Sequence, residues 1–593
     1  MEKGGISVST ENIFPVIKKW LYSDKDIFIR EVVSNACDAI TKYKRLVSLG
    51  ETEEAENDYK VEVIINKDEK TITVRDNGIG MTSEEVKKYI NQIALSGALE
   101  FIDKYESKDE NSSGIIGHFG LGFYSIFMIA DTVEMRTKSF LEEPAVLWTC
   151  DEAGSFSMKA DTKASRGTEI IMNVSDNEVA YLDKVKLKEI LAKYCSFMPY
   201  PVMFGEGEEL EQINDTNPIW QKKPSDVTEE EYNELYKKVF NDFADPLMYI
   251  HINADYPLNF KGILYFPKIK NEYESLEPKI NLYYNSVFVA DNIKDIVPEY
   301  LLNVKGILDC PELPLNVSRS YLQSNSYVQR VSQHIIKKVA DKINGLYTNE
   351  REQYEKLYDD LSTLIEYCCM RDKKFYERVK NSIIFKKTDK SYTTVNDYMD
   401  GKEEGEVLYT TGENTYDYYV NLYIQKGKSV LQLDKYIDTQ FVQFLESENN
   451  KIKFKRIDSA LDDLNEQTEQ DSDNDEKIKE IFDKYTQKGI DNIKIISLGE
   501  QDAPALISVT EESRRMNEMM KAYGMKGDTM PAQEMLSINI ANPIIKKLLN
   551  ENDEKQSVMV KQIYMSAVML SRKLTSEELN EFVDLNNRLL NLL

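Results

Sequence analysis

The alternation of apolar and polar residues predicts helices and antiparallel strands in the first third of the chain. Residues 11–47 carry apolar side chains at helical spacing. Apolar and polar residues then alternate singly over 61–65 and again over 72–74, on either side of a short polar turn, which is typical of a half-buried hairpin. A further strand is expected over 169–174. Helices and antiparallel strands mixed in this way predict an α+β sandwich.

The later part of the chain shows both patterns again. Strand-like apolar runs are expected at 262–266 and at 280–289. Helical periodicity follows at 325–345 and at 349–370. This mixture of strands and helices predicts an α/β arrangement in the middle of the protein.

Two amphipathic helices are expected at the C-terminal end, over 557–570 and 576–593. The second begins with the pattern Thr575-x-x-Glu578, a capping box in which each side chain bonds the backbone of the other residue. The apolar faces of these two helices could form a contact with a second copy of the chain. Packing within the C-terminal domain of one chain would also explain them.

Breaks in composition divide the chain into domains. The stretch 199–218 has few apolar residues and includes the acidic run 205–209, and 465–476 is almost wholly polar and acidic. A chain of 593 residues is too long for one hydrophobic core. We therefore expect an N-terminal domain, a short acidic linker, an α/β middle domain and a small α+β C-terminal domain, over 1–204, 205–217, 218–475 and 476–593.

Composition and charge exclude several classes of protein. The formal net charge is −28, and no long basic block is present to bind the phosphates of a nucleic acid. The six cysteines form no C-x-x-C pair, which predicts a reducing compartment and no zinc site. The first residues lack a basic and then apolar leader, and the most apolar stretch, 115–130, is interrupted by glycines and polar residues. We expect a cytoplasmic protein that binds neither nucleic acid nor membrane.

Three polar residues share one face of the first expected helix. Glu31, Asn35 and Asp38 are spaced i, i+4 and i+7, so on a helix their side chains point the same way. A carboxylate in this position could orient a water molecule, and an amide oxygen could ligate a metal. The same spacing, taken alone, also describes an ordinary solvated helix face.

A turn with two glycines follows the strand that ends near residue 75. It runs from Asp76 to Met81 as Asp-Asn-Gly-Ile-Gly-Met. The glycines let the backbone turn sharply beside a ligand, and Asp76 offers an acceptor for an exocyclic amine. An ordinary turn that closes a strand is the alternative.

Residues 114–125 form a glycine-rich loop that leads into an apolar helix. Glycines allow successive backbone N–H groups to face an anion, and the N-terminus of the following helix adds positive potential. The spacing differs from the dinucleotide-binding fingerprint and from the P-loop. The Gly-Lys-Ser at 427–429 is no P-loop either, because Leu422 stands where the first glycine of that motif belongs.

Together the motifs resemble a known group of ATPases. In this order, and with Gly167-Thr168 downstream, they resemble the ATP-binding fold shared by heat-shock protein 90, DNA gyrase, MutL and sensor histidine kinases. The residues at 21–31 and 116–125 resemble the heat-shock protein 90 family most, and the similarity continues through 313–323 and 542–548. The short linker, and an end that reads Leu-Leu-Asn-Leu-Leu in place of Met-Glu-Glu-Val-Asp, resemble the bacterial members.

This resemblance implies a fold and an activity. The fold would be an N-terminal α/β sandwich ATPase of the gyrase, heat-shock-90, histidine-kinase and MutL type. The activity would be that of an ATP-dependent chaperone, which hydrolyses ATP to ADP and phosphate with Mg²⁺ and assists unfolded client proteins in the stress response. Binding and hydrolysis of ATP would drive closure of the N-terminal domains in a homodimer joined through its C-terminal domains. Cooperation with a DnaK-type chaperone system is also implied.

The resemblance assigns roles in hydrolysis. Glu31 would activate the attacking water, and Arg30 would restrain Glu31 until the domains close. Asn35 would ligate Mg²⁺ through its side-chain oxygen. Arg319 would reach the γ-phosphate from the middle domain, with Gln323 beside it, and would so couple hydrolysis to domain closure.

Nucleotide-binding roles follow from the same resemblance. Asp76 would accept the adenine amino group, and Gly80 and Thr168 would complete its network of waters. The other expected contacts are with the helix face, the nucleoside and the phosphates: Asp38, Met81, Gly117, His118, Phe119, Gly120, Leu121, Gly122 and Phe123.

Three positions depart from the family pattern. Leu95 stands where Lys is usual, Ala98 where Thr is usual, and His118 where Gln is usual. Without the Lys, one contact with the phosphates is lost, which bears on nucleotide affinity and turnover but leaves the binding site itself in place.

The stretch 516–530 is a candidate client surface. Met516, Met519, Met520 and Tyr523 lie at i, i+3, i+4 and i+7, and further methionines follow. Flexible methionine side chains suit a surface that accepts varied apolar partners. A helix stripe that faces a core has the same spacing.

Two other functions stay open at this point. Another ATPase of the same group would need a phospho-accepting His ahead of the ATPase domain or a DNA-binding surface, and neither the positions of His118, His251 and His334 nor the charge supports this. A scaffold with an inactive ATP site is the second alternative, and the presence of Glu31 and Arg319 argues against it.

Overall fold

The computed structural model describes residues 24–53, 58–93, 95–105, 114–117, 120–206, 209–269, 276–291, 296–313, 326–411, 417–465, 472–510, 513 and 534–591. The chain divides into two compact units, residues 1–342 and 343–593. Each unit has its own sheets and its own buried apolar clusters. The boundary between the units falls inside the expected middle domain, 218–475.

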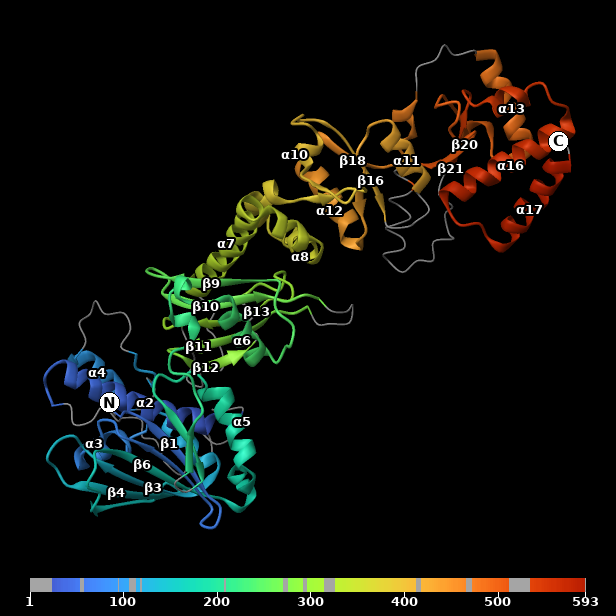
Figure 1. Ribbon diagram of the computed structural model, residues 1–593. Helices are drawn as coiled ribbons and strands as arrows, with labels where there is room; N and C mark the ends of the chain where they lie inside the picture. Colours follow the sequence, from blue (N-terminus) through green and yellow to red (C-terminus); the bar gives the residue numbers. More distant parts are fainter. Residues whose placement is uncertain are drawn as a thin grey trace, which may run out of the picture. The chain divides into compact units, whose positions relative to one another are not determined.

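An eight-stranded sheet forms the first part of the first unit (Figure 1). Its neighbouring strands are antiparallel except β1 and β7, which are parallel. The hairpin expected over 61–74 is confirmed as β1 and β2. In sheet order the strands are β5 (Phe156–Asp161), β4 (Ala145–Asp151), β3 (Ala130–Lys138), β6 (Gly167–Val174), β2 (Thr71–Asp76), β1 (Val61–Asn66), β7 (Val202–Glu206) and β8 (Glu209–Gln212).

Helix α2 is the central helix of this part. It packs on β1, β2 and α5, and almost every apolar residue along it is buried. This burial explains why its charged face must find partners inside the protein and cannot remain solvated. The helices are α2 (Ile27–Ser48), α3 (Ser83–Tyr89), α4 (Gly97–Tyr105) and α5 (Lys184–Cys195), with 3₁₀ turns η2 (Gly122–Met128) and η3 (Asp176–Leu182).

Strand β8 lies inside the stretch 205–217 that the composition predicts as a linker. It pairs with β7 at the edge of the sheet, with Gly205 opposite Leu210. Only glycine fits there, because a Cβ at Gly205 would lie 1.8 Å from the carbonyl oxygen of Glu209. The acidic side chains of β8 are those of a solvated edge strand. The first sheet therefore extends through Gln212.

A second, five-stranded sheet completes the strands of the first unit. The run 280–289, expected as one strand, is a hairpin, because Asn285 and Ser286 adopt φ values of 48° and 63° and reverse the chain. Strands β11 and β13 are parallel and the other neighbours antiparallel. The elements are β12 (Val287–Asp291), β11 (Lys279–Tyr284), β13 (Lys305–Asp309), β10 (Phe260–Phe266) and β9 (Met248–Ala254), with η4 (Ile219–Gln221), η5 (Pro224–Asp226) and α6 (Glu229–Phe240).

The described part of the second unit contains three small sheets. Strand β16 is parallel to both of its neighbours, and β21 lies parallel to β19 and antiparallel to β20. The strands are β14 (Phe385–Lys386), β15 (Tyr392–Thr393), β16 (Gly405–Thr411), β17 (Leu431–Leu433), β18 (Ile452–Arg456), β19 (Ile493–Ile496), β20 (Ala505–Val509) and β21 (Glu534–Asn539).

Helices make up much of the second unit. Those expected near 325–345, 349–370, 557–570 and 576–593 are confirmed as α7, α8, α16 and α17, and α7 crosses the boundary between the units. The helices are α7 (Ser326–Asn349), α8 (Arg351–Arg371), α9 (Lys373–Val379), η6 (Lys380–Ser382), α10 (Val395–Tyr398), α11 (Asp417–Gln425), α12 (Tyr436–Glu448), η8 (Leu461–Leu464), α13 (Ser472–Thr486), η9 (Ile490–Asn492), α15 (Pro543–Leu548), α16 (Asp553–Ser571) and α17 (Ser576–Asn591). Of the helices in the described ranges, none combines the length and apolar character needed to span a membrane.

Two buried carboxyl groups meet between α8 and α12. Glu366 is 3% exposed and Asp438 is 7% exposed, and the two carboxyl groups are close enough to influence each other's ionisation. Burial raises the pKa of Glu366 well above its usual value of 4.5, and the neighbouring carboxyl of Asp438 raises it further. Lys435 opposes this shift and donates from Nζ to Ser362 Oγ at 2.6 Å. Glu366 therefore keeps its proton at a pH where an exposed Glu is ionised.

We expect Glu366→Gln to make the second unit less sensitive to rising pH. The unfolded chain loses the Glu366 proton near its usual pKa of 4.5, whereas the folded chain keeps it. The free energy of unfolding should therefore fall as pH rises above this value, by up to about 1.4 kcal/mol per pH unit. Glutamine cannot titrate, so the variant should lose this slope. Hydrogen exchange of peptides from α8 and α12, corrected for intrinsic rates, measures it between about pH 5 and about pH 8.

The matched control is Glu352→Gln, an exposed position in the first turn of the same helix. This variant should keep the pH dependence of the original chain. Equal slopes for Glu366→Gln and the original chain would show that Glu366 does not hold a proton in the folded state.

Candidate functional site

A cavity of about 650 Å³ opens beside α2 in the first unit. Its walls come from α2, the turn after β2, α4, the glycine-rich loop, β3 and β6. Most of the predicted site residues line it: Glu31, Asn35, Asp38, Asp76, Gly80, Met81, Gly117, Gly120, Gly122, Phe123 and Thr168. Four predicted residues, His118, Phe119, Arg319 and Gln323, lie outside the described residues.

The Glu31 carboxylate is held by its neighbour in the chain. Arg30 donates to Glu31 Oε1 from Nε at 3.0 Å and from Nη2 at 2.8 Å, and both side chains are buried. The second oxygen, Oε2, lies against the loop, where a Cβ at Gly122 would be 2.4 Å from it. Arg30 itself is buried and is not part of the cavity wall. One carboxylate oxygen is thus fixed by a cation, and the other lies next to the loop.

Asp38 holds the beginning of the glycine-rich loop. Its Oδ1 accepts a hydrogen bond from the Ile116 N–H and its Oδ2 one from the Gly117 N–H, both at 2.7 Å. A Cβ at Gly117 would lie 3.0 Å from Asp38 Oδ2 and 3.3 Å from Asn35 Oδ1. Both oxygens of Asp38, which was predicted as a nucleotide contact, therefore accept hydrogen bonds from the protein backbone. The amide oxygen of Asn35 lies beside the same loop.

Asp76 is buried beside the turn that follows β2. Its Oδ1 accepts from the Gly78 N–H at 2.8 Å and from the Thr168 N–H at 3.4 Å. Burial raises the pKa of Asp76 to about 7, although these two N–H groups favour the ionised form. Gly80 has φ +64°, and a Cβ there would lie 1.9 Å from the Lys138 carbonyl oxygen. The turn therefore requires glycine at position 80, because its backbone lies against the backbone of Lys138.

Two residues at the site, Thr137 and Lys42, were not predicted from the sequence, because neither belongs to one of the motifs. Thr137 on β3 shares a hydrogen bond of 2.9 Å with the Thr168 hydroxyl and accepts one of 2.9 Å from the Met81 N–H. Lys42 lines the cavity, and burial lowers its pKa while the charge of Asp38 raises it. The i+4 spacing from Asp38 to Lys42 could have revealed the lysine, whereas nothing local marks Thr137.

Leu95, which departs from the family pattern, also lines the cavity. Gly120 has φ +64°, and a Cβ there would lie 2.6 Å from the Leu95 carbonyl oxygen. The loop therefore contacts position 95 through backbone atoms, so the change from Lys to Leu leaves this packing intact. Ala98, the other departure in this segment, is buried in the cavity wall. Leu121, predicted as a phosphate contact, is half-buried and packs against the core instead of the cavity.

The arrangement suits a ligand with an amine at one end and an anion at the other. Asp76 supplies a buried acceptor at the first end, Asn35 supplies an amide oxygen at the second, and Gly117, Gly120 and Gly122 of the glycine-rich loop line the wall there. Glu31 stands next to the loop, where it could take a proton from a water molecule. These are the groups that nucleotide binding and hydrolysis require.

Comparison with known proteins identifies two family matches. The model described as "Hsp90 protein" matches residues 205–593. The model described as "Histidine kinase-, DNA gyrase B-, and HSP90-like ATPase" matches residues 24–185. The second match contains α2, the glycine-rich loop and Asp76, so it covers the described cavity.

Relatives match along nearly the whole chain. The chaperone protein HtpG of Bacteroides thetaiotaomicron is 40% identical over 588 residues, which cover 93% of this chain and 85% of the relative. The protein of the same name from Porphyromonas gingivalis is 40% identical over 594 residues, covering 94% and 85%. That from Fusobacterium nucleatum is 30% identical over 584 residues, covering 95% of each chain.

These matches decide between the alternatives left by the sequence. A kinase, gyrase or MutL would share only the ATPase domain, whereas here the family match runs through residues 205–593 as well. The ATPase match over residues 24–185 identifies the first domain as an ATPase of the histidine-kinase, gyrase and heat-shock-90 type. The chain belongs to the heat-shock protein 90 family of ATP-dependent chaperones.

Proposed function

We propose that the cavity beside α2 is the ATP site and that Glu31 is the general base of hydrolysis. The observation that carries this is the placement of Glu31, Asn35 and Asp76 on one cavity of about 650 Å³, with the glycine-rich loop along its wall. Arg30 donates to Oε1 of Glu31, and Oε2 lies beside Gly122 of the glycine-rich loop; we propose that Oε2 receives the proton of the attacking water.

The adenine end of the nucleotide is assigned to Asp76. Its Oδ1 is engaged by two backbone N–H groups, so its second oxygen accepts from the adenine amine. Thr168 and Thr137 hold each other through their hydroxyls and can order the waters around the base. Met81 and Phe123 line the cavity as apolar walls for the nucleoside.

Asn35 fits the role of a magnesium ligand. Its side-chain oxygen lies beside Gly117, at the start of the loop proposed to bind the phosphates. Mg²⁺ prefers oxygen ligands and keeps phosphate oxygens and waters in its shell, so one amide oxygen from the protein is enough. When bound, the ion would neutralise charge on the phosphates. Gly117, Gly120 and Gly122 leave room for the phosphates close to the backbone.

Arg319 and Gln323 complete the proposed reaction. The family match over 205–593 includes both residues. We propose that Arg319 contacts the γ-phosphate only when the domains close and that Gln323 supports it. An arginine that arrives in this way stabilises charge in the transition state, so hydrolysis would wait for closure.

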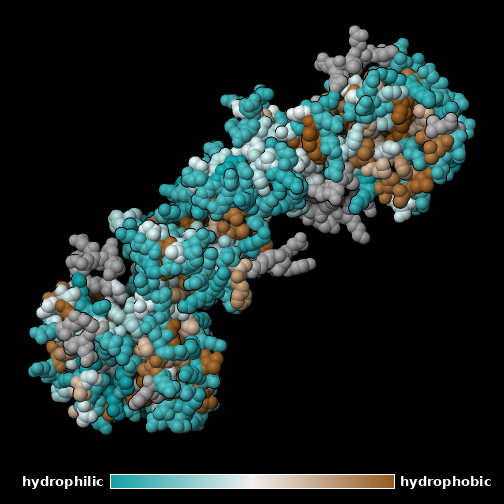
Figure 2. Space-filling view, viewed as in Figure 1, coloured by the Kyte–Doolittle hydropathy of each residue, from teal (hydrophilic) through white to brown (hydrophobic). Residues whose placement is uncertain are grey.

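We also propose that two copies of the chain pair through α17. Leu579, Val583 and Leu590 lie on one face of this helix and are 52%, 51% and 61% exposed. Figure 2 shows apolar surface on the part of the molecule formed by α16 and α17. An apolar helix face of this kind is typical of a bundle formed between copies.

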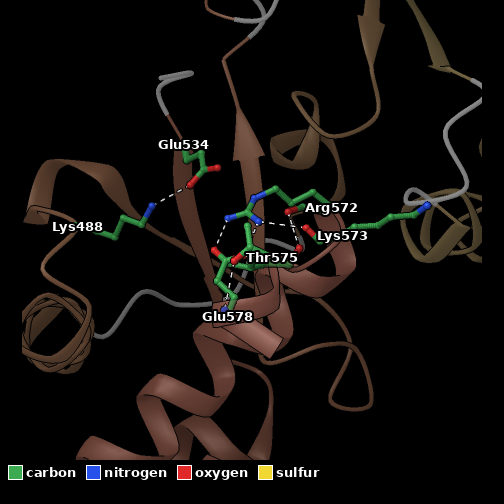
Figure 3. A network of polar contacts seen from close by, with 8 residues as sticks. Lys488, Glu534, Arg572, Lys573, Thr575 and Glu578 are labelled. Atoms are coloured by element: carbon green, nitrogen blue, oxygen red, sulfur yellow. Dashed lines mark hydrogen bonds and ion pairs between the residues drawn. The ribbon is translucent and has the colours of Figure 1, made fainter. Parts of the chain in front are cut away.

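A network of polar contacts joins α17 to the end of α16 (Figure 3). Arg572 donates to Glu578 through both terminal nitrogens, at 2.8 and 2.7 Å, and this pairing lowers the pKa of Glu578 to about 2. The capping box predicted from the sequence is confirmed, because the Thr575 N–H donates to Glu578 and the Glu578 N–H to the Thr575 hydroxyl. The Lys488–Glu534 pair lies nearby. These contacts fix how α17 leaves α16 and thereby where its apolar face lies.

We expect Val583→Asp to convert the dimer to a monomer and to slow ATP turnover. The new carboxylate would lie in the apolar contact without a partner, which is unfavourable. Turnover should fall because closure needs two copies held together. Sedimentation gives the mass, and steady-state phosphate release gives the turnover.

Asn580→Asp is the matched control, since it adds the same charge at an exposed position of α17 away from the apolar face. It should remain dimeric with unchanged turnover. A Val583→Asp variant that stays dimeric would overturn the pairing through α17.

The client and location of the chaperone are part of the proposal. We propose that unfolded proteins are its clients, that a DnaK-type system works with it, and that it acts in the cytoplasm; family membership supports this. The stretch 516–530, predicted as a client surface, lies outside the described residues. The ATPase rate with and without an unfolded protein, with an inhibitor of the family as control, tests the link between client and turnover.

A further inference from the structure

The Arg30 side chain is a buried cation in contact with two different groups. It is 1% exposed, and it donates to Glu31 Oε1 at 3.0 and 2.8 Å. On α5, the ring of Tyr194 lies with its centre 5.8 Å from Arg30 Cζ, within the range of a cation–π interaction. Since a buried guanidinium needs compensation, both contacts determine where it lies. The position of Tyr194 therefore bears on the position of the Glu31 carboxylate.

Tyr194 is one end of a row of packed aromatic side chains, all of them buried. The ring centres of Tyr194 and Phe288 are 5.8 Å apart, those of Phe288 and Tyr283 5.7 Å, and those of Tyr283 and Phe197 5.5 Å. Trp220 follows, 4.5 Å from Phe197. This aromatic row connects α5 with the hairpin of β11 and β12 and with η4. Packed rings transmit a displacement because such a core has few voids.

The turn of the same hairpin reaches the glycine-rich loop. Asn285 Nδ2 donates to the Ile115 carbonyl oxygen at 3.4 Å. The turn is held from behind by the buried Asp309, whose Oδ2 accepts from the Ser286 N–H at 3.0 Å and from Gln221 Nε2 at 3.0 Å. The hairpin thus contacts the glycine-rich loop directly and is connected to Glu31 through Tyr194 and Arg30.

We propose that Tyr194 is a positioning residue for ATP hydrolysis and that it ties the orientation of Glu31 to the docking of the β11–β12 hairpin on α5. The inference rests on the proposed role of Glu31 as the base. While the ring is in place, the Arg30 charge is shared between Tyr194 and Glu31. Without the ring, the guanidinium loses one of its contacts and interacts more strongly with the Glu31 carboxylate, which makes that carboxylate a weaker base and turns it from its working position.

The test compares Tyr194→Leu with Tyr194→Phe in the full chain. The leucine variant should lower kcat by about two- to thirtyfold, the range expected for loss of one buried cation–π contact, with ATP affinity and KM unchanged. The phenylalanine variant keeps the ring and loses only the hydroxyl, which donates to Asp24 at 3.2 Å. It should retain the original kcat. Lys193→Met is the matched control, because Lys193 also lies over the Tyr194 ring, at 4.7 Å, and is not bonded to Glu31.

Tyr194→Met provides a second variant of similar volume without a ring, in case leucine disturbs folding. Wild-type kcat in the methionine variant would overturn the inference, and so would a phenylalanine variant as slow as leucine. A parallel loss of ATP affinity and kcat would also overturn it, because that pattern indicates a disordered site and not a misplaced base.

Measurements in the Glu31→Ala variant test the role of Tyr194 separately from the proposal that Glu31 is the general base. If Tyr194 acts through Glu31, adding Tyr194→Leu to Glu31→Ala should not lower turnover further. A further drop would overturn the inference while leaving Glu31 as the base. If Glu31→Ala itself turns over like the original chain, the proposed base is wrong, whatever the Tyr194 variants do.

Discussion

Replacement of Glu31 by alanine is expected to leave ATP binding near the original level and to lower hydrolysis by roughly two to four decades, the usual effect of losing a general base. The binding contacts are made by other groups, with Asp76 at one end of the cavity and the glycine-rich loop at the other. The substitution removes the proton acceptor beside Gly122 and the partner of Arg30, which is not part of the cavity wall. Calorimetry measures the affinity, and phosphate release at saturating ATP measures kcat.

A loss confined to kcat would mark an interaction made in the transition state. The matched control is Glu84→Ala, an exposed position in the first turn of α3 outside the cavity. This control should hydrolyse ATP at the original rate. Hydrolysis by Glu31→Ala within about twofold of the original would remove Glu31 as the base, since general-base losses are much larger.

Asp76→Asn is expected to abolish measurable nucleotide binding, with ATP affinity lower by at least about 100-fold. The Gly78 and Thr168 N–H groups still donate hydrogen bonds to the oxygen of the new amide. Its NH₂ group must then face the adenine amine, so two donors meet and neither has an acceptor. Calorimetry with ATP and with ADP measures the loss. Asp68→Asn, an exposed change in the turn between β1 and β2, should bind normally.

The same carboxyl group should make ATP binding depend on pH. Burial raises the pKa of Asp76 to about 7, so a large part of the protein carries a protonated Asp76 at lower pH. The adenine amine needs the ionised acceptor, and binding therefore releases a proton below this value. Affinity should fall as pH decreases through 7, by up to about tenfold per pH unit. Affinity that stays constant over this range, or Asp76→Asn with normal affinity, would place the adenine elsewhere.

The polar face of α2 could be predicted because helix geometry is local. Residues at i, i+4 and i+7 lie on one side of any helix, and Glu31, Asn35 and Asp38 do line one cavity. The β1–β2 hairpin and the capping box at Thr575 were predictable for the same reason, since each depends on residues close in sequence.

Contacts between distant strands could not be predicted in this way. Thr137 on β3 meets Thr168 on β6 only because these strands are neighbours in the sheet. The turn at Asn285 and Ser286 was missed because apolar residues continue on both sides of it, and the run from 280 to 289 resembles one strand. Strand β8 within the predicted linker 205–217 was not foreseen, because an acidic edge strand and an acidic linker have the same composition.

The class of the protein and most of the residues that line the cavity could be predicted from the sequence, because residue type and short spacing along a helix or turn are local properties. The contacts of these residues with distant parts of the chain are seen in the folded structure alone. Asp38 bonds the backbone at Ile116 and Gly117, and Arg30 lies between Glu31 and the Tyr194 ring. Ile116, Gly117 and Tyr194 lie far along the chain from their partners on α2 and meet them because α2, α5 and the loop pack together in one core, and no local spacing encodes that packing.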